Sequence, residues 1–298
     1  MNLRRAVYSL LLLGACTLGA IKLKAFCYAQ TGGFALYKIC SSLAFNPAWE
    51  VASLGQGEEA ELDLALSQPY HFLAKGAQCF VFSSEDGHHV IKFFKLSHLL
   101  PPVWLNNMRL PFALEPMRIK KIAQKREELN RDFLSYKIAY EELRDQTGML
   151  FLHLNKTHCL KRHLTVIDRL GISYDLDLDN MEFLVQKQAS LFYPFIEKTL
   201  AEKGEEGVKV IISDLVSLLA LRNRKGIFDK DPDINSNFGF LNNRCAQIDI
   251  GRFRKDLTRC SPDVYRPEIL RITDSFNQWL QPRSPALSKY LEHEIQSS

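Results

Sequence analysis

Apolar and polar positions follow two different periods along this chain. From about residue 71 to residue 94, two apolar runs flank a polar turn at 83–87 that contains glycine. Apolar runs joined by such a turn are typical of a β-hairpin, so we expect strands across this stretch. Apolar runs at 149–154 and 183–186 predict further strands, and the alternating residues 175–179 suit either a strand or a turn.

Two longer segments have the period of an amphipathic helix. Between about residues 118 and 146, apolar side chains recur at helical intervals before Gly148 ends the pattern. They belong to Leu129, Phe133, Tyr136, Tyr140 and Leu143. We interpret this stripe as core packing. Residues 205–222 predict a second amphipathic helix, and strands followed by helices indicate an α+β fold.

The N-terminal residues have the composition of a targeting or anchoring segment. Two arginines precede residues 6–21, which carry no charge, and two lysines follow. Sixteen apolar residues are short for a spanning helix, which needs about 20, and match a signal peptide or a marginal anchor. Basic residues on both sides leave the side of the membrane open. We therefore expect residues 1–24 to be a signal peptide or a membrane anchor.

A lipid could also hold the N-terminus at a membrane. The run Leu13-Gly-Ala-Cys16 resembles a bacterial lipobox, in which the cysteine carries the lipid. We expect membrane association, through a signal anchor or as a lipoprotein through Cys16. Residues 25–45 stay largely apolar and 56–66 are acidic, so we interpret residues 25–69 as an apolar, then acidic connector.

Composition changes this picture little. The chain has 298 residues, of which 46% are hydrophobic and 24% charged, as in an ordinary globular protein. A net charge of +4 spread over the chain, without an aromatic and basic platform, argues against nucleic acid as a partner. The seven scattered cysteines form neither a disulfide framework nor a zinc-site spacing.

Several polar residues interrupt apolar runs near the C-terminal end and in the hairpin. Lys92, Asn237 and Asp249 each lie within such a run, where a buried polar group needs a partner. Three acids precede the asparagine: Asp229, Asp231 and Asp233. A hard cation takes oxygen ligands, and phosphoryl transfer needs a further carboxylate at the acceptor. The order predicts a magnesium–nucleotide site, in which Asn237 and Asp249 hold the metal. The ordinary alternatives are turns, a solvated acidic loop and a lysine that reaches solvent.

Residues 73–82 resemble the glycine-rich loop of the protein-kinase-like superfamily. Ala74 stands for the first glycine, Gly76 is kept, Cys79 stands for the third and Val81 is kept. The following Val-Ile-Lys92 resembles the strand that carries the phosphate-binding lysine.

The second half of the resemblance lies far downstream. Asp249-Ile-Gly251 resembles the metal-binding Asp-Phe-Gly motif, and Asn237 with its following strand resembles the catalytic-loop asparagine. The resemblance covers about residues 70–255.

The resemblance implies a two-lobed fold that binds ATP and Mg²⁺. The N-lobe, residues 70–189, would hold an antiparallel sheet, a helix and a proline-rich insertion. A reduced helical C-lobe, residues 190–298, would hold the catalytic and metal loops, with a hinge at 186–189. The residues implied for the cofactor are Gly76, Ala77, Gln78, Val81 and Lys92. The resemblance also implies a carboxylate on the long helix as partner of the lysine, either Glu128 or Glu141.

The sequence departs from the family pattern at the catalytic loop. The usual spacing would put the catalytic aspartate at Pro232, and the preceding His-Arg is absent. Asp231 is our first choice for the acceptor-side acid, with Asp229 and Asp233 as alternatives. Only 47 residues follow Gly251, too few for a peptide-holding subdomain. This suits a small or lipid substrate, or a lobe reduced to nucleotide binding. The function that we expect is possible transfer of the γ-phosphate to a small-molecule, lipid or protein hydroxyl, and the sequence names no protein partner.

Two other classes of function stay open. One is a pseudokinase or interaction module that keeps the fold without turnover. The other is a membrane-anchored structural protein in which the motifs arise by chance, with Lys92 and Asp249 far apart in space.

Overall fold

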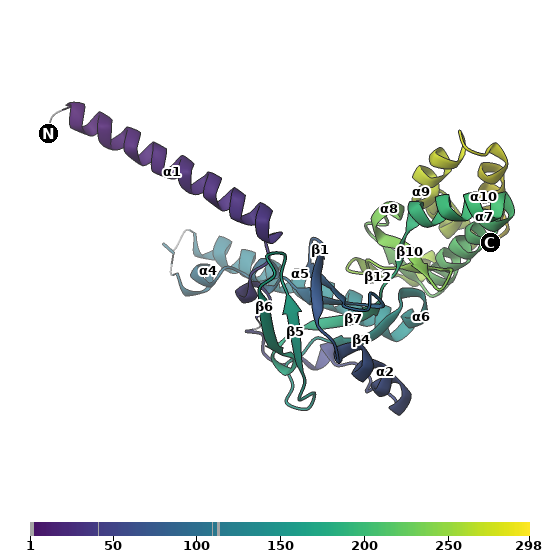
Figure 1. Cartoon of the computed structure of the whole chain (residues 1–298), viewed down its shortest axis with the longest axis horizontal. Coiled ribbons are helices and arrows are strands. Elements are labelled where there is room, and N and C mark those ends of the chain that lie inside the picture. The colour runs from purple at the N-terminus through teal and green to yellow at the C-terminus, as the bar shows by residue number, and fades with distance from the viewer. Residues whose placement is uncertain (1–2, 41, 109, 112–113) are drawn as a thin grey trace.

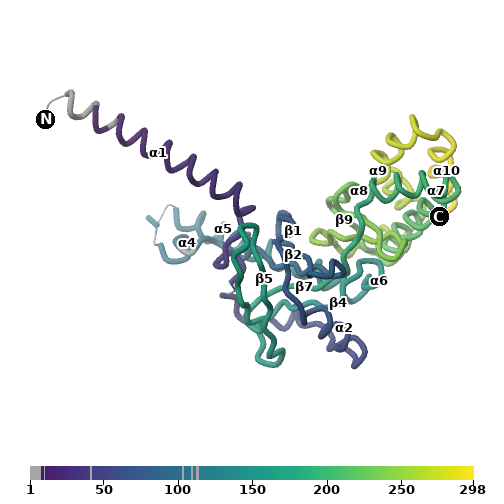
Figure 2. Tube along the Cα trace, viewed as in Figure 1, coloured from purple at the N-terminus to yellow at the C-terminus, as the bar shows by residue number. Residues whose placement is uncertain are grey.

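A curled seven-stranded sheet forms one part of the molecule, and a helical part follows it (Figure 1). The computed structural model describes residues 3–40, 42–108, 110–111 and 114–298. An apolar helix precedes the sheet, and the chain runs from this helix through the sheet to the C-terminal helices (Figure 2). The expected α+β class, with a sheet lobe before a helical lobe, is confirmed.

The sheet is mostly antiparallel. In sheet order its strands are β4 (Met149–His153), β7 (Phe183–Lys187), β3 (His89–Phe94), β2 (Cys79–Ser84), β1 (Tyr70–Lys75), β5 (His163–Ile167) and β6 (Ser173–Asp177). Only the β1–β5 pair among them is parallel. The expected antiparallel sheet therefore gains a parallel pair, because the chain reaches β5 by a long connection and not by a hairpin. Residues 175–179 continue β6 into a 3₁₀ turn, η3 (Leu178–Asn180).

The long predicted helix packs on this sheet. It is α5 (Glu115–Glu142), followed by the short α6 (Arg144–Thr147), which ends at Gly148 with φ of 65°. Every residue of the predicted apolar stripe is buried. Gly148 ends the helical segment as expected, because a left-handed residue after a helix favours glycine.

The segment that we expected to be a connector belongs to the core of the sheet lobe. It forms η1 (Leu36–Lys38), η2 (Pro47–Trp49) and α2 (Gln56–Leu66). Phe34 lies between aromatic rings of the sheet, with Phe80 and Phe82 centroids at 5.3 and 5.2 Å. Leu62 of α2 is buried in the same cluster. Apolar burial explains why this stretch folds onto the sheet instead of linking two parts.

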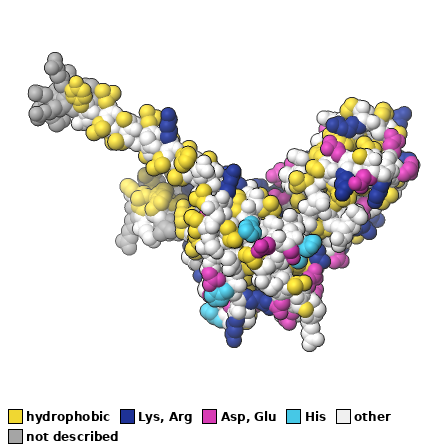
Figure 3. Space-filling view, in the orientation of Figure 1, with side chains coloured by type: hydrophobic (Ala, Val, Ile, Leu, Met, Phe, Trp, Pro, Cys, Tyr) yellow, Lys and Arg dark blue, Asp and Glu magenta, His cyan; other side chains and the backbone are white. Residues whose placement is uncertain are grey.

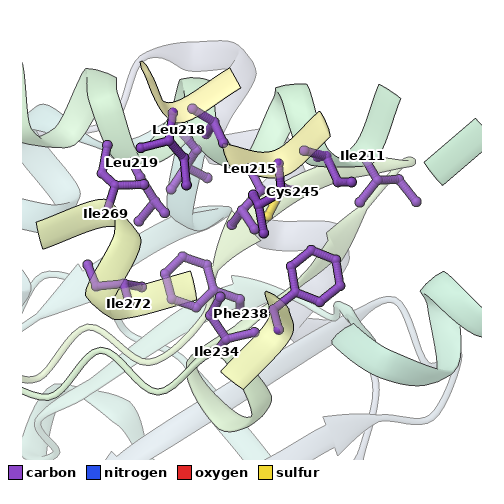
Figure 4. Close-up of a cluster of buried hydrophobic side chains, with 14 of the residues drawn as sticks. Ile211, Leu215, Leu218, Leu219, Ile234, Phe238, Cys245, Ile269 and Ile272 are labelled. Atoms are coloured by element: carbon purple, nitrogen blue, oxygen red, sulfur yellow. The ribbon is translucent and has the colours of Figure 1, made fainter. Parts of the chain in front are cut away.

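The helical lobe has its own apolar core. It contains α7 (Phe192–Arg224), α8 (Ile234–Asn237), α9 (Pro262–Leu280) and α10 (Pro285–Ser297). Figure 4 shows side chains of α7, such as Leu215 and Leu219, facing Phe238 and Ile272. The amphipathic pattern at 205–222 thus lies inside a longer helix, which bends at Gly204, where φ is 65°.

Short strands join this lobe to the sheet lobe. They are β8 (Ser190–Leu191), β9 (Ile227–Asp229), β10 (Phe238–Leu241), β11 (Arg244–Gln247) and β12 (Phe253–Lys255), with the 3₁₀ turn η4 (Leu257–Arg259) at the end. β10 pairs with β11 and β8, and β12 pairs with β9. β9, which leads into Asp231, and β12, which follows Gly251, therefore run side by side.

The N-terminal helix α1 (Leu3–Thr31) projects away from the body (Figure 3). Residues Leu11–Thr31 are long and apolar enough to cross a membrane, and none of this stretch is buried inside the protein. A signal sequence has the same features. The helix extends ten residues beyond the apolar stretch 6–21, because it continues through two lysines.

Asp179 fixes the long connection between β4 and β5 and supplies a test of this fold. Its carboxylate accepts hydrogen bonds from Thr157 Oγ1, from Leu160 N at 3.1 Å and from Lys161 N at 2.7 Å. Burial raises the pKa of Asp179, but these hydrogen bonds outweigh burial and lower the pKa below its ordinary value. The carboxylate form is therefore the one that the fold favours.

We expect Asp179→Ala to lower the free energy of unfolding at pH 7 by about 1–3 kcal/mol, since hydrogen bonds to a charged group are lost. A carboxyl whose pKa is lowered by folding stabilises above its unfolded pKa of about 3.9 and stops doing so as the pH falls through its folded value. The difference from wild type should therefore shrink below about pH 4. Urea unfolding at several pH values measures it. Asp175→Ala, at an exposed position of β6, is the control, and an equal loss in both variants would contradict this role.

Candidate functional site

A cleft of about 850 Å³ lies between the two lobes. Its walls come from the β1–β2 loop, β3, α5, the connection between β7 and β8, the segment before α8, and residues 248–252. Among its lining residues are the predicted positions Gly76, Ala77, Gln78, Val81, Lys92, Asp229, Asp231, Asn237 and Asp249. The expected hinge residues 186–189 line it as well. The size suits a small-molecule ligand.

Lys92 spans the cleft. It lies on β3, paired with Val81 of β2 and Leu184 of β7, so the sheet fixes its backbone on both sides. Its Nζ donates a hydrogen bond to the carbonyl of Ile248, at 2.7 Å. Burial lowers the pKa of Lys92, and the nearby carboxylate of Asp249 partly offsets this. The ammonium and Asp249 are therefore neighbours, which a structure with chance motifs would not require.

Asn237 connects the loop of the three candidate acids to the Asp-Ile-Gly segment. Its backbone carbonyl accepts hydrogen bonds from Ile248 N at 2.7 Å and Asp249 N at 3.3 Å. Its side-chain Nδ2 donates to the carbonyl of Asp231, at 2.5 Å. The amide oxygen of Asn237 accepts a hydrogen bond from Ser236 Oγ at 2.9 Å, and Asn237 lines the cleft together with the exposed Asp249. An amide and a carboxylate oxygen are ligands that Mg²⁺ accepts alongside phosphate and water.

The three candidate acids occupy different environments. Asp231 is exposed and lines the cleft. Asp233 instead caps α8, where its carboxylate accepts hydrogen bonds from Asn235 N at 3.3 Å and Ser236 Oγ at 2.6 Å. It is not among the residues that line the cleft. An N-terminal cap accounts for this aspartate without a catalytic role.

Asp229 lies buried at the floor of the cleft. Its Oδ2 accepts a hydrogen bond from Gln247 Nε2 at 2.5 Å, and Gln247 Oε1 accepts one from Arg222 Nη1 at 2.6 Å. Its Oδ1 accepts from Asp231 N at 3.0 Å, which shapes the loop that carries Asp231. Burial raises the pKa of Asp229, the hydrogen bonds and Arg222 oppose that rise, and Asp249 adds to it. Asp229 thus fixes the backbone of the loop that carries Asp231.

The two helix glutamates do not reach the lysine. Glu128 pairs with Lys125 at 2.9 Å, and Glu141 lies 3.8 Å from Lys137 Nζ. Neither lines the cleft. The buried stripe of α5 faces the sheet, so both glutamates lie toward solvent. The predicted carboxylate partner of Lys92 is therefore not formed in this structure.

Tyr136 of α5 lines the cleft. Sequence reasoning missed this residue, because a tyrosine in an apolar helical stripe is usual in a core. Its hydroxyl donates to Gln78 Oε1 at 2.9 Å and lies 3.7 Å from Cys79 Sγ. Burial, with Cys79 and Asp249 nearby, raises the pKa of Tyr136 well above its ordinary value. The helix thus presents a neutral phenol to the cleft.

Gln78 bridges the β1–β2 loop and the segment that contains Gly251. Its Nε2 donates to the carbonyl of Gly251 at 3.4 Å while its Oε1 accepts from Tyr136. A Cβ at position 251 would lie 1.9 Å from Gln78 Oε1. Glycine at this position leaves room for the Gln78 amide, which would have to move if residue 251 had a side chain.

Among the described residues, no group of three or more His, Cys, Asp or Glu side chains is placed to hold a metal ion. A magnesium site of the predicted kind needs fewer protein ligands, since phosphates and water complete it. The donor set of Asn237 and Asp249 fits that pattern.

No protein-family model matches the chain, and no curated protein matches it significantly. Solved structures give only weak likenesses. The bifunctional kinase-methyltransferase WbdD aligns at 13% identity and a TM-score of 0.36, over 74% of this chain and 42% of WbdD. The ROP18 kinase domain in complex with AMP-PNP and sucrose aligns at 16% identity and 0.32, over 62% and 51%.

A third likeness is to Rv3197 bound to erythromycin, from Mycobacterium tuberculosis, at 12% identity and 0.30, over 75% of this chain and 56% of that one. The chain thus spans about half the length of these structures. Similarity at this level does not establish a family, so the candidate function depends on the cleft itself.

The Gln78 contact makes a prediction about the loop. We expect Gln78→Ala to increase amide hydrogen exchange at residues 76–79 in the unliganded protein, because the loop loses its tie to Gly251 and Tyr136. Hydrogen-exchange mass spectrometry measures this. Gln124→Ala, which removes an exposed glutamine of α5, is the matched control. Unchanged exchange in Gln78→Ala would show that the contact does not hold the loop.

Proposed function

We propose that this chain binds Mg-ATP in the cleft between its lobes and transfers the γ-phosphate to a small-molecule, lipid or protein hydroxyl, as an atypical member of the kinase-like proteins. The hydrogen bond from Lys92 Nζ to the carbonyl of Ile248 is the observation that supports this most. It joins the lysine of the sheet lobe to the residue before Asp249, in the order that the sequence resemblance implies.

Each cleft residue has a role in this proposal. The loop around Gly76, with the backbone of Ala77 and Gln78, would cover the phosphates, and Val81 would pack on the base. The ammonium of Lys92 would bind phosphate oxygens, which would add anionic partners to a partly buried cation that already bonds to the carbonyl of Ile248. Asn237 and Asp249 would hold the metal. A bound magnesium ion supplies charge neutralisation of the phosphates.

Asp231 is the acceptor-side acid that we favour among the three. It is exposed within the cleft, whereas Asp233 caps a helix and the buried Asp229 accepts a hydrogen bond from Gln247. A carboxylate at the cleft wall can orient the acceptor hydroxyl and accept its proton.

We also propose that α1 keeps the protein at a membrane, as a signal anchor or through a lipid on Cys16, which is exposed on α1. Length and hydropathy support this proposal. The same membrane would bring lipid hydroxyls within reach as acceptors.

A second function is favoured by specific contacts. Gln78 bonds to both Gly251 and Tyr136 across the cleft, and neither Glu128 nor Glu141 pairs with Lys92. Both features suit a pseudokinase or interaction module that binds nucleotide without turnover. Binding and transfer must therefore be measured separately.

Nucleotide binding is tested by thermal stability. At an ATP concentration about 100 times the dissociation constant, with Mg²⁺, we expect the folded state to gain about 2.7 kcal/mol. Asp249→Asn should remove the metal-dependent part of the gain. Lys92→Met should remove most of the gain while leaving the unliganded protein folded, since it deletes a buried cation.

Melting curves with and without nucleotide, each with Mg²⁺ or EDTA, measure these shifts. Asp263→Asn, an exposed aspartate of α9, is the control and should keep the full gain. A melting temperature that saturating nucleotide leaves unchanged with any divalent ion would refute the site.

Phosphoryl transfer is tested by comparing the three acids. We expect Asp231→Ala to lower the transfer rate by about 10²–10⁴-fold with nucleotide affinity nearly intact. Asp233→Ala should cost about 0.5–2 kcal/mol of stability through loss of the α8 cap, and little rate. Asp229→Ala should destabilise the protein, because Gln247 and Arg222 lose a buried partner.

Transfer of radiolabelled phosphate to the protein itself, to lipids and to small hydroxyl compounds gives the readout. If wild type binds ATP without transfer to any of these, and the three variants match it, the pseudokinase function is correct.

A further inference from the structure

The segment between β3 and α5 carries an exposed apolar surface that the nucleotide proposal does not use. This segment includes α3 (Leu96–Leu99) and α4 (Val103–Asn107) and leads into the first turns of α5. We call its outward side chains the insertion surface: Trp104, Met108, Leu114, Met117 and Ile119, which are 62%, 40%, 47%, 69% and 55% exposed. Large apolar side chains gathered in this way mark an interaction site.

The insertion surface is held in shape by polar contacts beneath it. Arg118 Nη1 donates to the carbonyl of Leu105 at 2.9 Å, which ties α4 to α5. The carboxylate of Glu115 accepts from Arg118 Nε and, at 3.2 Å, from Leu110 N. Leu105 is buried. These contacts tie the described parts of the segment, α4 and the first turn of α5, to each other.

The surroundings of the insertion surface are basic. Residues 96–126 contain six lysines and arginines and a single acid, Glu115, which bonds to Arg118. Lys120 and Lys121 are exposed beside Met117 and Ile119. Apolar side chains flanked by exposed lysines are typical of segments that lie in the interface of an anionic bilayer.

The insertion surface also lies near the C-terminal end of α1. Helix α3 contacts η1, the turn that follows α1, where Leu36 and Tyr37 are exposed. In Figures 1 and 3 the insertion projects from the body on the side from which α1 leaves. The exposed apolar residues of η1 and of the insertion thus lie close to the end of the apolar helix α1.

The body holds the end of α1 firmly. Phe34 is buried among the rings of the sheet just after the helix ends, and Lys75 Nζ lies 4.0 Å from the ring centroid of Tyr28. A bilayer entered by α1 would therefore meet the sheet lobe on a defined side, which is the side of the insertion.

We propose that the insertion surface docks on the anionic bilayer that α1 enters, with Trp104 and its apolar neighbours in the headgroup region and Lys120 and Lys121 at the lipid phosphates. This inference rests on the membrane association in the proposed function and is independent of nucleotide binding. Docking would fix the orientation of the sheet lobe, and of the cleft opening, relative to the lipid surface.

The test uses the full chain reconstituted in vesicles of phosphatidylcholine and phosphatidylserine, some with acyl chains brominated near the headgroup end. The chain has three tryptophans, at positions 49, 104 and 279. Bromolipid should quench wild-type tryptophan emission. Trp104→Phe should lose most of the quenched component, whereas Trp279→Phe should keep it, because Trp279 lies in the helical lobe.

Charge reversal gives the second arm. The Lys120→Glu, Lys121→Glu double variant should reduce quenching in phosphatidylserine vesicles and should differ little from wild type in neutral ones, since the attraction to anionic lipid is lost. Both lysines are exposed, so the double variant should stay folded.

Three results would overturn the inference. Vesicle flotation without Trp104 quenching would leave α1 as the anchor and remove the docking surface. Protection of Trp104 from acrylamide without bromolipid quenching would show that a second copy or another protein covers the surface. Failure to float would remove both the anchor and the docking, while a failed ATP shift would leave this inference unaffected.

Discussion

The hydrogen bond from the partly buried ammonium of Lys92 to the carbonyl of Ile248 is the constraint on which the candidate site depends. A lysine within an apolar strand needs a partner, and here the partner belongs to the other lobe. Because Lys92 is fixed by strands on both sides, the bond also fixes the segment that carries Asp249. One contact therefore ties the sheet lobe to the segment that carries Asp249, the residue that we propose as a metal ligand.

The floor of the cleft is built from a second set of polar contacts. Asn237 joins its own loop to the Asp-Ile-Gly segment, and Asp229 is tied through Gln247 to the buried Arg222. Networks of this kind are costly when partly broken, so they specify one arrangement of the loop. Asp231 is carried on this loop with its carboxylate exposed, which is why geometry separates it from the other two acids.

Interrupted apolar runs marked Lys92, Asn237 and Asp249 as polar residues that need partners. The resemblance to the kinase-like proteins then implied that they meet in one site, and all three line the cleft. The sequence could not predict which face of α5 meets the cleft. Glu128 and Glu141 have the right chemistry, yet the helix turns them to solvent and Tyr136 inward, since packing on the sheet decides the rotation. The burial of Phe34 and the parallel β1–β5 pair were equally out of reach, because both depend on contacts between residues far apart in the chain.

The neutral phenol of Tyr136 has a consequence for how the lobes respond to their surroundings. A lysine paired with a glutamate would hold its charge balance without nucleotide, and added salt would weaken that balance. Lys92 has a carbonyl and a neighbouring Asp249 instead, so a polyanionic ligand would be the main source of countercharge. The charge balance of the cleft would then follow ligand occupancy, and ionic strength would act chiefly through the ligand and not through a lysine–glutamate ion pair.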